Sequence, residues 1–191
     1  MKPVFKKLLL VHQKYIDREE GDYPYWYSER PHISLLAAAV WLSDGTALEE
    51  YGIHKTKERK PKRGRCDLGI RANKKTGFEC EAKHLWLDIG SRTEDFARKV
   101  KVKLQVAVGD VKKLESKTGL ALCFVTPAIH KSELGELDMR CDELIRSVRS
   151  NSWWNALIWI RIKKGQRPVG QDLLYLGLLL AIKEVKRPVA R

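Results

Sequence analysis

Three charged side chains between Arg65 and Trp86 have the types and spacing needed to hold a divalent cation beside a phosphodiester. Asp67 stands in the segment RCDLGI, and Glu81 and Lys83 stand in FECEAKH. Both segments alternate apolar and polar residues, so each is expected to be a strand with one charged face. Two adjacent carboxylates repel each other unless a cation lies between them, and Mg²⁺ prefers oxygen ligands, with Mn²⁺ as a substitute. Lys83 would orient or deprotonate a water, or neutralise charge on the phosphate.

The residues between the two segments favour a tight turn. They read Asn73-Lys74-Lys75-Thr76-Gly77, and Asn and Gly both tolerate a positive φ. An antiparallel hairpin is therefore expected, and its pairing would bring Asp67 and Glu81 close enough to share a cation. The alternative of a hairpin with one solvated charged face stays open, because Glu-x-Lys is common on exposed strands.

The pattern of Asp67, a spacer and then Glu81-Ala82-Lys83 resembles the signature of the restriction-endonuclease-like PD-(D/E)xK nuclease superfamily. The resemblance implies a metal-dependent nuclease that hydrolyses phosphodiester bonds, with DNA as the expected substrate and endonucleolytic cleavage as the expected mode. It implies that Asp67 and Glu81, with a backbone carbonyl near Ala82, bind Mg²⁺ and that Lys83 positions the attacking water. The superfamily often adds a glutamate from a preceding helix. Glu29 is the first candidate and Glu50 the second, although Glu29 could equally balance a helix dipole.

The order of expected elements agrees with the αβββαβ core of that superfamily, a mixed central sheet flanked by helices. Hydrophobic spacing and turn residues separate the elements. They are a helix over 4–19, an apolar helix opened by Pro31, a strand over 47–55, the two hairpin strands, a helix over 93–114, a strand over 119–127, a helix over 132–149, a strand over 153–165 and a helix after Asp172. For Glu49 and Glu50, a last helical turn remains an alternative to the strand.

Length and composition predict a single domain over 1–191, and the resemblance implies that it is nuclease-like. Its parts are an N-terminal helix (1–20), the core motif region (29–127) and a C-terminal helix-strand-helix (128–191). No apolar run is long enough for a membrane span, so we expect a soluble cytoplasmic protein without a membrane partner. The four cysteines form no CxxC pair, which favours free thiols over a zinc site.

The charge of the chain indicates a polyanionic partner. The formal net charge is +13, which favours nucleic acid. Candidate phosphate contacts precede and enter the Asp67 strand: Lys55, Lys57, Arg59, Lys60, Lys62, Arg63 and Arg65. Two other functions remain open, a non-catalytic nucleic-acid-binding or assembly protein on the same scaffold and an RNA-directed nuclease. A homodimer is one alternative for the oligomeric state.

Overall fold

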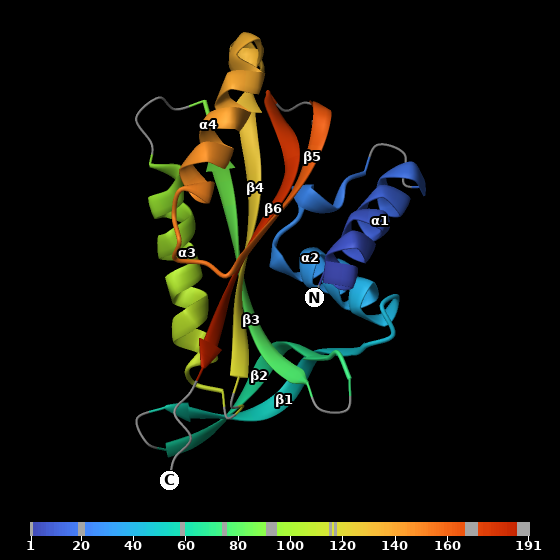
Figure 1. The fold of residues 1–191 in the computed structure, drawn as a ribbon, viewed down its shortest axis with the longest axis vertical. Helices are drawn as coiled ribbons and strands as arrows, with labels where there is room; N and C mark the ends of the chain where they lie inside the picture. Colours follow the sequence, from blue (N-terminus) through green and yellow to red (C-terminus); the bar gives the residue numbers. More distant parts are fainter. Residues whose placement is uncertain are drawn as a thin grey trace.

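A mixed six-stranded sheet, in the order β1-β2-β3-β4-β6-β5, forms the centre of the protein (Figure 1). The computed structural model describes residues 2–18, 22–57, 60–73, 76–90, 95–114, 116, 118–166 and 172–186, without the side chains of 56, 57, 60–62 and 162–166. The elements are α1 (Lys2–Arg18), the 3-10 turn η1 (Pro24–Trp26), α2 (Glu29–Trp41), β1 (Thr46–Lys57), β2 (Lys60–Arg71), β3 (Gly77–Asp88), α3 (Phe96–Val111), β4 (Thr118–His130), η2 (Lys131–Glu136), α4 (Leu137–Arg149), β5 (Ala156–Gln166) and β6 (Leu173–Lys186). The prediction of an α/β fold with a mixed sheet flanked by helices is confirmed.

Helices cover both faces of the sheet, with α1 and α2 on one side and α3 and α4 on the other (Figure 1). Alternate residues of β3 divide between these layers, as the period of a strand requires. Cys80 and Ala82 belong to the apolar cluster that includes α1 and α2, whereas Leu87 belongs to the cluster that includes α3 and α4. Glu81 and Lys83 have the parity of Leu87, so this parity assigns them to the α3 side of the sheet.

The expected hairpin is confirmed, and its two strands separate next to Asp67 and Glu81. β2 and β3 pair antiparallel from Arg71 opposite Gly77 to Leu68 opposite Cys80, and within the described chain their pairing ends there. β2 remains paired with β1 as far as Lys60, so β1 and β2 continue together away from β3 (Figure 1). β3 instead pairs in parallel with β4, and α3 connects these two strands.

The prediction of a helix after Asp172 is wrong, because Leu173–Lys186 is the strand β6. Its leucine-rich sequence suits a helix, but the segment lies between β4 and β5 and is buried on both faces from Leu176 to Ile182. A strand buried on both faces shows no period of two, so its pattern does not separate it from a buried helix. The C-terminal region therefore contains a helix and two strands.

Two smaller expectations are also resolved. The segment over 132–149 divides into the 3-10 turn η2 and the helix α4. Glu49 and Glu50 lie in β1, and Glu50 has a φ of 51°. Among the described helices, none is long and apolar enough to cross a membrane.

Candidate active site

Asp67 lies where β2 separates from β3. Continuing the observed register would place Asp67 opposite Glu81. At this point a side chain, and not the backbone of β2, bonds to β3: Asp67 Oδ2 accepts a hydrogen bond of 2.8 Å from the backbone N–H of Ala82. This bond satisfies an edge donor of β3 and holds the carboxylate beside the segment Glu81-Ala82-Lys83.

Glu81 is a buried carboxylate, with a relative exposure of 2%. Its Oε1 accepts a hydrogen bond of 2.8 Å from Lys55 Nζ. Burial raises the pKa of Glu81 to about 7; Asp67 adds to this rise and the Lys55 ammonium opposes it. The carboxylate predicted to bind a metal ion therefore forms an ion pair with the ammonium of Lys55.

Lys83 connects the hairpin to α3. Its Nζ donates to the carbonyl of Ala82 at 2.7 Å and forms an ion pair of 3.1 Å with Asp110. Burial works against the charged form, but Asp110 and the nearby Glu29 outweigh it and raise the pKa of Lys83. Lys83 is therefore an ammonium at neutral pH, which favours charge neutralisation or water positioning over proton abstraction.

The two candidate upstream glutamates differ in their surroundings. Glu29 lies in the first turn of α2, and burial raises its pKa, while the charges of Lys83 and Asp67 also act on it. Glu50 instead forms ion pairs with Arg65 at 3.4 Å and Arg30 at 3.7 Å. The start of α2 thus brings Glu29 into the electrostatic field of the hairpin residues, and Glu50 is directed toward arginines.

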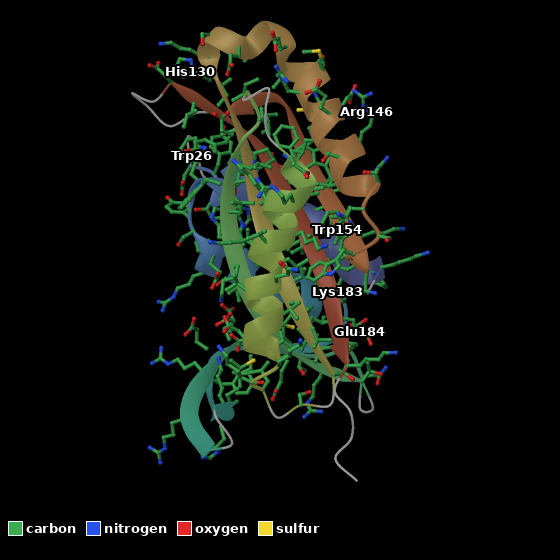
Figure 2. All side chains as sticks on the ribbon, turned by 90° about the vertical axis from the view of Figure 1, so that its left-hand side faces the viewer. Trp26, His130, Arg146, Trp154, Lys183 and Glu184 are labelled. Atoms are coloured by element: carbon green, nitrogen blue, oxygen red, sulfur yellow. The ribbon has the colours of Figure 1, made fainter. Side chains whose placement is uncertain are left out.

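The predicted phosphate contacts whose side chains the structure describes divide into two groups. The side chain of Lys55 points to Glu81, and it does so across Gly64, where an added Cβ would lie 2.8 Å from Lys55 Cδ. Arg63 and Arg65 are exposed on the arm formed by β1 and β2, from which nitrogen-tipped side chains extend in Figure 2. Arg59 and the side chains of Lys57, Lys60 and Lys62 lie outside the part that the structure describes.

Two acidic residues near the candidate site, Asp110 and Glu79, were not among the predicted site residues. Asp110 binds Lys83, and the available signal was that it is the single acid in the sequence of α3. Glu79 lies two residues before Glu81; its Oε2 is buried without a hydrogen-bond partner among the described residues, and its Oε1 accepts from the Tyr51 hydroxyl at 3.4 Å. Its parity with Glu81 was the signal in this case.

One cavity is lined in part by Glu79. Its volume is about 880 Å³, and its lining includes Trp41, Tyr51 and Glu79 at the closed end of the hairpin. Asp67, Glu81 and Lys83 do not line it. Cavity size alone therefore does not identify the charged cluster, which is recognised by its chemistry.

The donor set suits a hard cation. Asp67 and the buried Glu81 supply carboxylate oxygens, and Mg²⁺ commonly uses one or two carboxylates together with waters and substrate phosphate. Among the described residues, no group of three His, Cys, Asp or Glu side chains is arranged to hold a metal ion by itself. A cation here would therefore need ligands beyond these two side chains.

Comparison with protein-family models, with curated proteins and with solved structures found no match for this chain.

Proposed function

We propose that this protein is a metal-dependent nuclease that hydrolyses phosphodiester bonds in DNA. The observation that carries the proposal is the buried Glu81 beside Asp67 at the point where β2 leaves β3, with Lys83 next to them. The order α2, β1, β2, β3, α3, β4 supports a restriction-endonuclease-like core, because it places the Asp and the Glu-x-Lys on the second and third strands.

Each residue has a distinct proposed role. Asp67 and Glu81 would hold Mg²⁺ or Mn²⁺, which when bound supplies a Lewis acid for the phosphate oxygens. The ammonium of Lys83, held by Asp110, would face the charge that develops on the phosphate and orient the attacking water. Glu29 would set the charge of the cluster from the start of α2.

Charge-removing variants test this assignment. Asp67→Asn keeps an oxygen that can accept from the Ala82 N–H, and Lys83→Gln keeps a polar side chain, so both should fold. We expect each to lower the rate of Mg²⁺-dependent DNA cleavage on the order of 100-fold or more. Cleavage would be followed on labelled oligonucleotides, with circular dichroism as the check of folding.

Matched controls are available elsewhere on the chain. Asp44→Asn removes an exposed carboxylate at a φ of 60°, which Asn tolerates, and Lys6→Gln removes an exposed ammonium on α1. Both should cut at the wild-type rate. Unchanged cutting by Asp67→Asn and Lys83→Gln, relative to these controls, would exclude the proposed site.

One observation favours a second function, a non-catalytic nucleic-acid-binding or assembly protein. The Lys55 ammonium already balances Glu81, so the carboxylate is compensated without a metal ion. Salt-sensitive binding with no turnover in Mg²⁺ or Mn²⁺ would favour this function. Parallel digestion of single- and double-stranded DNA and RNA would distinguish an RNA-directed nuclease.

A further inference from the structure

A second cavity lies between β3 and α3, which run side by side on the face turned to the viewer in Figure 2. Its volume is about 310 Å³, at the lower end of the range of about 300–1,000 Å³ typical of ligand sites. The residues that line it are Leu85, Trp86, Arg98, Lys99, Val102 and Lys103. We call it the α3–β3 groove.

The lining combines an aromatic surface with positive charge. Trp86 is 53% exposed although its ring packs edge-on against His84, with ring centroids 4.5 Å apart. The contact leaves much of the indole open to solvent while restricting its orientation. All three charged residues of the lining, Arg98, Lys99 and Lys103, are basic. An exposed aromatic ring among cations suits a nucleotide, because the base can stack while the phosphates meet the charges.

The groove lies farther along the same strand as the proposed active site. Trp86 lies three residues beyond Lys83 on the same strand, which corresponds to about 10 Å, or roughly three nucleotides of a stacked strand. Because this offset is odd, the two side chains belong to opposite faces of β3. Lys103 connects the two regions electrostatically, because its charge acts on both Glu29 and His84. A strand whose phosphate lies at Asp67 and Glu81 would therefore reach Trp86 by crossing the edge of β3 that β2 leaves unpaired in the described chain.

We propose that the α3–β3 groove binds an unpaired base of the nucleic acid substrate, stacked on Trp86, with neighbouring phosphates at Lys99 and Lys103. The inference rests on the proposed nuclease function and narrows its substrate to nucleic acid with a single-stranded segment. A continuous duplex keeps its bases stacked on one another and offers no free face to Trp86, so it binds this groove less well.

Binding without cleavage tests the proposal. Fluorescence anisotropy in EDTA would compare a labelled 20-nucleotide single strand with the matching duplex. We expect Trp86→Ala to bind the single strand about tenfold more weakly, the loss of one base stack, and to bind the duplex as the wild type does. Trp86→Phe should retain most of the affinity, and Trp86→Leu, which keeps apolar contact but removes the aromatic face, should not.

Trp41→Ala is the matched control, because Trp41 is 57% exposed and lines the larger cavity. Its affinity for the single strand should equal that of the wild type. Equal binding by wild type and Trp86→Ala overturns the proposal, as does a loss confined to Trp41→Ala or a wild-type protein that binds no single strand. A changed oligomeric state of Trp86→Ala in size-exclusion chromatography, with unchanged affinity, would show a protein interface instead. Failure of the nuclease proposal is a separate result, the absence of cleavage in Mg²⁺ and Mn²⁺.

Discussion

At the scale of single residues, the ion pair between Lys55 and Glu81 governs the charge of the candidate site. A carboxylate at 2% exposure is costly unless a positive group accompanies it, and here Lys55 Nζ lies 2.8 Å from Glu81 Oε1. The side chain of Lys55 is itself only 22% exposed, so solvent screens the pair weakly. In the proposed active state, a metal ion would share or replace this role.

Removal of the Lys55 ammonium should therefore destabilise the metal-free protein. We expect Lys55→Met to lower the free energy of unfolding by about 2 kcal/mol, because Glu81 stays buried without its cation. Added Mg²⁺ should stabilise Lys55→Met more than it stabilises the wild type. Urea denaturation with and without Mg²⁺ measures both effects. Lys6→Met on the exposed face of α1 is the control, and a Lys55→Met variant as stable as this control would contradict the expectation.

At the scale of elements, β6 pairs with both β4 and β5, and its backbone lies very close to that of β5 at one glycine. Gly177 of β6 lies opposite Arg161 and has a φ of 114°, a backbone region that L side chains rarely adopt. An added Cβ would overlap the carbonyl oxygen of Ile160. A glycine inside this apolar strand is thus required by the neighbouring backbone.

Gly177→Ala should destabilise the protein by about 3 kcal/mol or more, because both the backbone conformation and the overlap are unfavourable. Gly109→Ala is the matched control: it is exposed in α3 with no atom within 4 Å of the added Cβ. In a helix, alanine is favoured over glycine by about 1 kcal/mol, so this variant should be slightly stabilised. Thermal unfolding of the two variants should shift in opposite directions, and a neutral Gly177→Ala would refute the account of β6.

At the scale of the whole molecule, three buried histidines connect the helical layer of α1 and α2 with the sheet. His12 of α1 and His32 of α2 have ring centroids 6.4 Å apart, and His32 lies 5.3 Å from His84 of β3. His12 and His32 are 1% and 0% exposed. Within the described chain, His12 Nε2 and both ring nitrogens of His32 are buried without a hydrogen-bond partner, so this row tolerates added charge poorly.

Acid should weaken the fold through His12. Burial lowers its pKa from 6.5 to about 4, so below pH 6.5 the unfolded chain gains a proton that the folded chain does not. The contribution of neutral His12 to the free energy of unfolding is fully present above pH 6.5 and falls as the pH decreases toward 4. At pH 5 this contribution is smaller by about 2 kcal/mol. Between pH 7 and pH 5, the free energy of unfolding of His12→Phe should therefore fall by about 2 kcal/mol less than that of the wild type. Urea denaturation at the two pH values tests this, and equal losses in both proteins would contradict it.

The sequence by itself determined the hairpin and the residues on its charged face. Alternation with a period of two and the turn residues Asn73 and Gly77 are local signals, so they needed no knowledge of the rest of the chain. The same holds for the amphipathic helix that became α3, although its bounds moved to Phe96 and Val111. Asp67, Glu81 and Lys83 lie together because strand parity fixes their face.

Tertiary structure alone decided the partners of those residues and the nature of the last element. Lys55 meets Glu81 and Asp110 meets Lys83 across 26 and 27 positions of sequence, and no local pattern encodes such contacts. Leu173–Lys186 is a strand because β4 and β5 lie on its two sides and satisfy its backbone, which overrides the helical preference of leucine. Local periodicity therefore determined the hairpin and its charged face, whereas long-range pairing and burial determined the ion-pair partners and the strand β6.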